Sequence, residues 1–184
     1  MTMRFLTFLA LIAALLLAPG MTQAANETKP AVNSQTFGDW KLDCLKDKNA
    51  AVSDCQLMQK HFINGKDGKK KPLLLVQGAL LTVKNKEGKS GQVLVFRMFT
   101  PLNTLLPAHL NVKLDSGKPM KLEFITCVPV GCMAEMPVND ALVEQLKKGN
   151  SLLVAYKSAH NGKQQNATVS LKGFTAAYDA LKKG

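Results

Sequence analysis

Short apolar runs separated by Gly, Asn, Asp and Pro make up most of the chain from Thr36 onward. Runs of this length, rich in β-branched and aromatic residues, predict strands, and the breakers between them predict turns. The predicted strands cover residues 37–44, 55–63, 73–84, 92–100, 110–115, 120–128, 133–138, 151–158 and 167–171. The pair Asn161-Gly162 is a clear turn signal, because Asn-Gly favours a tight hairpin between two strands.

Two segments show the periodicity of a helix instead of that of a strand. Asn139 is a suitable N-cap for a helix that ends at Gly149. A second helix, from Phe174 to Leu181, has apolar residues three and four positions apart and can pack one face on the body of the protein. Many strands with few helices and no strand–helix alternation predict an all-β fold, an antiparallel β-sandwich with two short helices.

The first apolar run of the chain belongs to a different kind of segment. Residues 1–24 have the build of a secretory signal peptide, with Arg4 before the apolar run and small residues up to Ala24. The run is shorter than the roughly 20 apolar residues of a spanning helix, so we predict cleavage after Ala24 and no transmembrane anchor. Residues 25–35 are polar and predict a flexible leader, and residues 36–184 have the length of a single domain.

Composition and charge add a basic surface to this picture. The chain has 184 residues, of which 46% are hydrophobic, and its 24 Lys and Arg against 13 Asp and Glu give a formal charge of +11. A chain with this apolar content is expected to fold, which excludes a disordered basic tail. Four lysines cluster in one predicted loop: Lys66, Lys69, Lys70 and Lys71.

The lysine cluster is a candidate contact for an anionic partner. Long-range attraction can bring such a loop to lipid head groups, acidic glycans or another anionic component of the envelope or host surface. The alternative is a solvated loop that keeps an exported protein soluble. Nucleic acid is disfavoured as a partner, because Lys dominates over Arg, aromatic residues make up 6% of the chain, and export separates the protein from the chromosome.

Export also changes the interpretation of the cysteines, because an oxidising compartment favours disulfides over metal or redox chemistry. Of the three possible pairings, we predict Cys44 with Cys55 and Cys127 with Cys132, since each pair flanks a short segment. A zinc site is disfavoured by the ligand spacing and by the lack of a nearby His, and no C-x-x-C redox motif occurs. Trp40 is expected in the core near the first disulfide, with an exposed ligand-stacking role as the alternative.

Five strings stand in a fixed order along the chain: Thr36-Phe37-Gly38-Asp39-Trp40, Asp54-Cys55, Pro101-Leu102 with Leu105-Leu106-Pro107, Cys127-Val128-Pro129-Val130-Gly131-Cys132, and Ser170-Leu171-Lys172-Gly173-Phe174. In this order they resemble the invasion-associated locus B family of exported bacterial proteins, over about residues 36–181. The resemblance implies an immunoglobulin-like sandwich in the periplasm or envelope of a Gram-negative bacterium, or outside the cell. It also implies a link to host-cell invasion in some members, and it carries no catalytic mechanism.

Catalytic chemistry finds little support in the residues themselves. His61, His109 and His160 are the only histidines, and none lies in a hydrolase or zinc-protease motif. Asp39 and Glu135 could form a carboxylate pair only if the fold brought them together. We therefore predict a non-enzymatic interaction protein without a cofactor. The alternatives are a periplasmic ligand-binding or chaperone-like module that uses an exposed sheet edge, and a hydrolase of unknown type. The sequence specifies neither the partner nor the oligomeric state.

Overall fold

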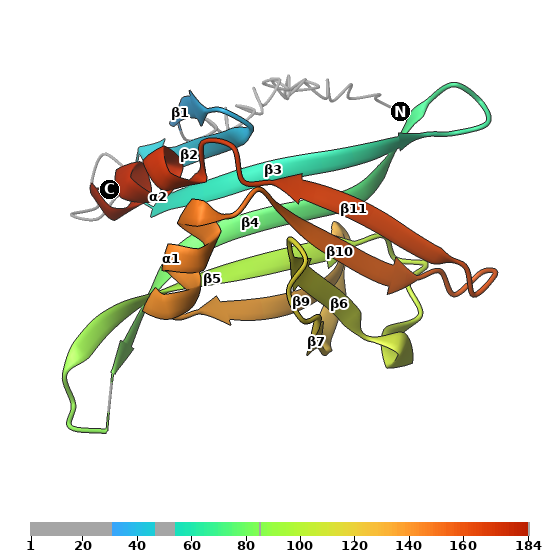
Figure 1. Ribbon diagram of the computed structural model, residues 1–184. Helices are drawn as coiled ribbons and strands as arrows, with labels where there is room; N and C mark the ends of the chain where they lie inside the picture. The colour runs from blue at the N-terminus through green and yellow to red at the C-terminus, as the bar shows by residue number, and fades with distance from the viewer. Residues whose placement is uncertain (1–30, 47–53, 85, 184) are drawn as a thin grey trace, which may run out of the picture.

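Two antiparallel sheets pack as a sandwich, with two helices at one end (Figure 1). The computed structural model describes residues 31–46, 54–84 and 86–183, so the predicted signal peptide lies outside the described residues. The prediction of an all-β antiparallel sandwich with two short helices is confirmed by this arrangement.

The larger sheet has, within the described residues, seven strands in the order β1-β2-β3-β4-β5-β9-β8. Their bounds are β1 (Ala31–Phe37), β2 (Trp40–Lys46), β3 (Asp54–Asn64), β4 (Lys70–Lys84), β5 (Ser90–Thr100), β9 (Gly131–Val138) and β8 (Phe124–Val128). The first five strands are spatial neighbours in sequence order, so β4 lies in the centre of the sheet. Its two hairpins therefore project from opposite ends of the molecule.

The smaller sheet has, in the same part of the chain, four strands in the order β11-β10-β6-β7. Their bounds are β11 (Gln164–Ser170), β10 (Ser151–Lys157), β6 (Leu110–Leu114) and β7 (Met120–Leu122). A single-turn 3-10 helix, η1 (Leu106–Ala108), lies between β5 and β6. The α-helices are α1 (Asp140–Lys148) and α2 (Phe174–Lys183), and the side chain of Asn139 accepts the Leu142 N–H at 2.9 Å as the predicted N-cap of α1.

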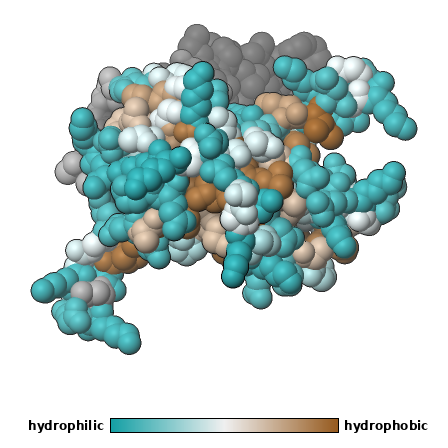
Figure 2. All heavy atoms as spheres, viewed as in Figure 1, coloured by the Kyte–Doolittle hydropathy of each residue, from teal (hydrophilic) through white to brown (hydrophobic). Residues whose placement is uncertain are grey.

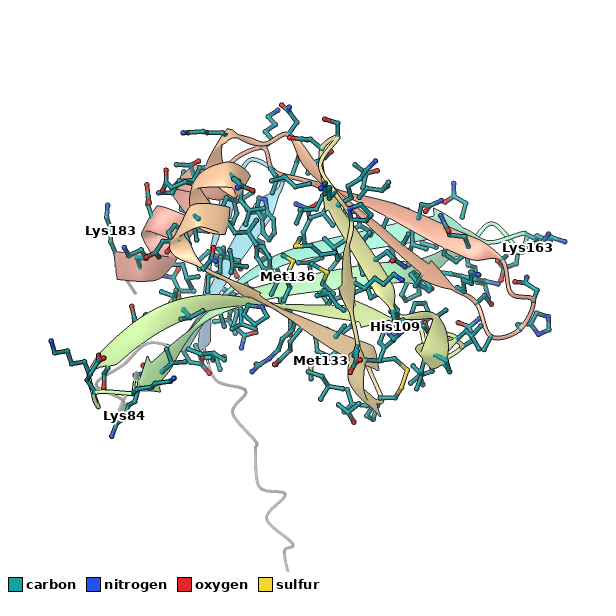
Figure 3. All side chains as sticks on the ribbon, turned by 60° about the horizontal axis from the view of Figure 1, so that its bottom comes forward. Lys84, His109, Met133, Met136, Lys163 and Lys183 are labelled. Atoms are coloured by element: carbon teal, nitrogen blue, oxygen red, sulfur yellow. A yellow bond between two sulfur atoms is a disulfide. The ribbon has the colours of Figure 1, made fainter. Side chains whose placement is uncertain are left out.

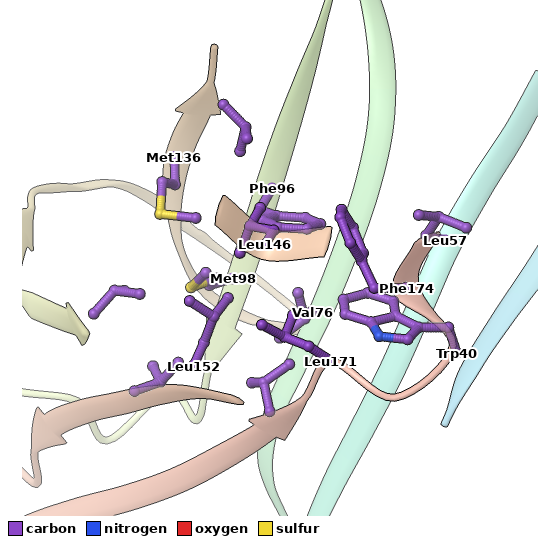
Figure 4. Packing of buried hydrophobic residues seen from close by; sticks show 14 of the residues in the cluster. Trp40, Leu57, Val76, Phe96, Met98, Met136, Leu146, Leu152, Leu171 and Phe174 are labelled. Carbon is purple, nitrogen blue, oxygen red and sulfur yellow. The ribbon is translucent and has the colours of Figure 1, made fainter. Parts of the chain in front are cut away.

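Three aromatic rings form the centre of one core between the sheets and α2 (Figure 4). The rings of Trp40 and Phe96 stack at 5.7 Å between centroids, and Phe174 meets both edge-on at 5.6 and 6.0 Å. Such offset and edge-to-face arrangements are favoured by the quadrupole of the rings. The smaller sheet contributes alternate residues, among them Leu152 and Val154, which are fully buried.

The β1–β2 turn meets the segment before α2 backbone to backbone. Gly38 and Gly173 have φ angles of +58° and +85°, and a Cβ on either would collide with a carbonyl of the opposite segment. The Asp39 N–H donates to the carbonyl oxygen of Lys172 at 3.1 Å. This close approach requires glycine on both sides.

A polar contact joins the two sheets at the end of β11. The side chain of Gln59 donates to the Ser170 carbonyl oxygen at 3.0 Å and accepts from the Ser170 N–H at 3.0 Å. The indole N–H of Trp40 donates to the same carbonyl at 2.9 Å. Gln59 on β3 thus completes the hydrogen bonds of a strand in the other sheet.

Three predicted segments need correction. Residues 31–35 of the predicted flexible leader lie in β1, because pairing with β2 satisfies a backbone whose side chains are mostly polar; residues 25–30 lie outside the described residues. The strand predicted over residues 37–44 is divided by the turn at 38–39. The strand predicted over residues 120–128 changes sheets at Glu123, with β7 before it and β8 after it.

Candidate functional site

Both disulfides join residues that lie directly opposite each other on neighbouring strands. Cys44 pairs with Cys55 between β2 and β3, and Cys127 pairs with Cys132 between β8 and β9. These are the predicted pairs. All four sulfur atoms are therefore in disulfide bonds, and none of the four cysteines is a free thiol. Trp40 is fully buried and contacts aromatic rings, while Cys44 follows about 13 Å further along β2.

The β3–β4 hairpin brings the four predicted lysines together at an exposed tip. The turn is held by Gly65, whose N–H donates to the Lys69 carbonyl oxygen at 2.8 Å. Lys66, Lys69, Lys70 and Lys71 are all exposed. Lys71 faces Asp67 at 3.9 Å, but with both side chains about half exposed, this ion pair compensates little of the charge. The hairpin therefore presents a concentrated positive charge to solvent.

A β-bulge lies at the base of this hairpin. His61 pairs with Leu74, but the next residue, Phe62, pairs with Pro72, so Leu73 is an extra residue on β4. A proline on a central strand is tolerated at a bulge, where no ladder hydrogen bond is required of it. The Leu73 carbonyl oxygen accepts the hydroxyl of Tyr156 at 3.0 Å, which ties the bulge to the smaller sheet.

The bulge opens an apolar cavity of about 250 Å³ on one side of Pro72. Its walls come from four strands or their ends, including Phe62 of β3, Leu73 of β4, Phe99 of β5 and Val130 before β9. Lys60 is the single charged residue among those that line it. Apolar cavities with a few polar groups are typical binding sites for small ligands.

His61 also lines this cavity and has an unusual environment. Its Nε2 atom is buried and has no hydrogen-bond partner. Burial lowers the pKa of His61 below its ordinary value, because the charged imidazolium loses solvation. The ring is therefore neutral at neutral pH, and the cavity keeps its apolar character.

A second cavity of about 450 Å³ adjoins the first and shares Pro72 and Pro101 with it. Most of the residues that line it have polar or charged side chains: Lys71, Asn103, Ser158, His160, Asn161 and Gln165. Tyr156 closes its inner side, and burial raises the pKa of this phenol to about 12, so it remains a hydrogen-bond donor. An apolar and a polar cavity thus lie next to each other across two prolines.

Large apolar side chains are exposed around both cavities. They include Phe62 (51% exposed), Ile63 (43%), Leu102 (61%), Leu106 (41%) and Val130 (60%). We call the part of the protein formed by residues 60–75, 99–109, 128–132 and 156–165 the Pro72 end. Figure 2 shows hydrophobic surface at the base of the β3–β4 hairpin, next to its hydrophilic tip. Figure 3 shows Lys163, at the Pro72 end, far from Lys84 on the opposite hairpin.

The candidate catalytic residues are not assembled into a site. His160 contacts Ser158 through its backbone N–H, at 3.3 Å from the hydroxyl oxygen, and not through its ring. Glu135 on β9 pairs with Arg97 at 2.9 Å between the Arg Nε and a carboxylate oxygen. Asp39 lies beside β2, four strands away from β9 in the same sheet, so roughly 19 Å of sheet separates the backbones of the two residues.

The family described as Invasion associated locus B (IalB) protein matches residues 40–182. The chain belongs to this family. Two Invasion protein B homologs of Brucella abortus, from strain 2308 and from biovar 1 strain 9-941, are each 26% identical over 148 residues, which is 80% of this chain and 78% of the relative.

A solved structure shares the fold. The crystal structure of invasion associated protein B from Bartonella henselae matches with a TM-score of 0.62 and 21% identity, over 82% of this chain and 96% of the other. At this identity, the match supports the sandwich and no residue role. In the part of the IalB chain that the structure describes, none of the helices has the length and apolar character needed to cross a bilayer.

Sequence reasoning found the lysine cluster of this IalB protein but missed the cavities beside it. One signal was available, because Pro72 stands directly before the apolar run that begins at Leu73, and a proline there marks a strand start, a bulge or an edge. Another was the lack of alternation in Phe62-Ile63 and Leu105-Leu106, which places apolar residues on both faces of exposed segments. The cavity walls themselves come from distant parts of the chain.

Proposed function

We propose that this protein is a non-enzymatic, exported interaction protein whose β3–β4 hairpin contacts an anionic surface of the bacterial envelope or of a host cell. The observation that carries the proposal is the exposed tip with Lys66, Lys69, Lys70 and Lys71. Membership of the IalB family and the invasion-related names of the Brucella relatives support an interaction role. Two disulfides support an oxidising compartment, and we assign the protein to the periplasm or the cell exterior.

Charge supplies the affinity for such a surface. Each lysine held near an anionic membrane contributes about 1 kcal/mol, and the attraction decreases within a Debye length of about 8 Å at physiological salt. Because the four lysines share one protruding hairpin, they can approach the surface together. Their contributions to the binding free energy add, and the partner surface needs no complementary shape for this.

The test replaces Lys66, Lys69, Lys70 and Lys71 by Gln and measures sedimentation with phosphatidylglycerol vesicles. We expect at least about a tenfold loss of binding, and for the unchanged protein a decrease with added salt. The control removes the same charge elsewhere, by replacing Lys118, Lys121, Lys172 and Lys183, which are exposed, with Gln. An equal loss in the control, or binding that salt does not affect, would contradict the role of the hairpin.

A further inference from the structure

We propose that the two adjoining cavities of the Pro72 end form one binding site for an anionic amphiphile with a single alkyl chain. The chain would occupy the apolar cavity of about 250 Å³, and the anionic head the polar cavity of about 450 Å³. This goes beyond the surface contact proposed above, because it concerns one bound molecule and uses only Lys71 of the four lysines.

The division of the site into two halves is the first argument. Pro72 and Pro101 line both cavities, so the two are adjacent, and the proposed ligand spans these prolines from one cavity to the other. On one side lie Phe62, Phe99 and Val130, which offer carbon atoms to an alkyl chain. Burial of each methylene group there would contribute about 0.8 kcal/mol.

Charge complementarity is the second argument, and it selects the sign of the head group. None of the residues that line either cavity carries a carboxylate, whereas Lys60 and Lys71 are charged and both are exposed. The polar half also offers the side chains of Asn103 and Asn161 as hydrogen-bond donors. A carboxylate or phosphate head would be matched by these groups, and a cationic head would not.

The apolar half of the site is built on the bulge and on a disulfide-held hairpin, which is a third argument for a ligand there. The extra residue Leu73 is 7% exposed, and its carbonyl oxygen is fixed by the Tyr156 hydroxyl at 3.0 Å. The neighbouring hairpin is held by the Cys127–Cys132 disulfide, which positions Val130 at the mouth of the apolar half. A site built on fixed elements loses little entropy when it binds a ligand.

Calorimetric titration with dodecyl phosphate, kept below its critical micelle concentration, tests the site directly. We expect one molecule of dodecyl phosphate to bind per protein molecule. Dodecyl maltoside, which has the same alkyl chain and no charge, should bind at least about tenfold more weakly. Inorganic phosphate, which has no alkyl chain, should not bind. Lys71→Gln should remove the preference for the anionic head. The triple change of Lys66, Lys69 and Lys70 to Gln should leave dodecyl phosphate binding unchanged.

A substitution at the mouth of the apolar half distinguishes binding at this site from nonspecific hydrophobic adsorption. Val130 is 60% exposed, so Val130→Trp should fold normally yet obstruct the cavity and weaken dodecyl phosphate binding at least about tenfold. The matched control is Val83→Trp on the opposite hairpin, where the native side chain is 43% exposed, and it should bind as the unchanged protein does. Urea unfolding of both variants verifies their folding.

Three outcomes would overturn the inference. The first is that dodecyl phosphate does not bind. If the protein still binds vesicles in that case, the proposed surface contact holds and only the cavity site is rejected. The second is unchanged binding by Val130→Trp. The third is that an acidic peptide with one Phe binds under the same conditions while dodecyl phosphate does not. That result would assign the cavities to a segment of a protein partner.

Discussion

Gly173 has a left-handed backbone, with φ +85°. A Cβ added to it would collide with the carbonyl oxygen of Phe37. We expect Gly173→Ala to lower the free energy of unfolding by at least about 3 kcal/mol, from backbone strain and from displacement of the β1–β2 turn. Gly162→Ala is the matched control, because Gly162 has φ +67° and open space around it, and should cost about 1 kcal/mol. Urea unfolding measures both, and equal losses would show that the backbone contact does not matter.

His61 is a second residue whose environment predicts a measurable effect. Because its pKa is lower in the folded protein than the value of about 6.5 in an unfolded chain, the unfolded chain binds protons more readily. The free energy of unfolding should therefore decrease as the pH falls from about 7 to 5. His61→Leu removes both the titrating group and the unpaired Nε2, and should add about 1 kcal/mol at pH 7. Thermal unfolding at several pH values tests this, and an unchanged pH dependence in the variant would count against it.

At the scale of elements, the contact between β3 and β11 holds the sheets together. Gln59→Leu would leave the Ser170 N–H without its acceptor in a partly buried position, and we expect a loss of about 2 kcal/mol. Gln56→Leu, on the opposite face of β3, is the control and should change stability by less than about 0.5 kcal/mol. Chemical denaturation compares them. Similar values for both variants would mean that the inter-sheet hydrogen bonds contribute nothing.

Most elements could be predicted because their ends carry breakers that act locally. The strand over residues 92–100 and the helix capped by Asn139 are examples, since each boundary depends on a few adjacent residues. β1 could not be predicted in this way, because its sequence is polar and its structure comes from pairing with β2. Register is likewise a tertiary property, so the bulge opposite Phe62 follows from packing and not from local preference.

At the scale of the whole molecule, the sequence predicts the charged part of the candidate site and not its shape. The four lysines are close together along the chain, so their grouping needs no knowledge of the fold. The apolar cavity instead forms because Phe62, Phe99 and Val130 lie on the same side of Pro72 and Pro101. The order of the strands in the sheet brings these three residues together. The five strings that resemble the IalB family also divide in space. The first and last meet at the Gly38–Gly173 contact, while those around Pro101 and Val130 lie at the Pro72 end.

The meeting of these first and last strings has a consequence for how the protein matures. The hydrogen bond from Trp40 to Ser170 joins residues 130 positions apart, and Phe174 completes the ring cluster around the indole. Contacts between such distant parts of a chain are slow to form, because closing the long loop between them costs entropy first. A chain delivered to its compartment N-terminus first would therefore keep its largest apolar side chain exposed to proteases and chaperones until residues 170–174 had arrived.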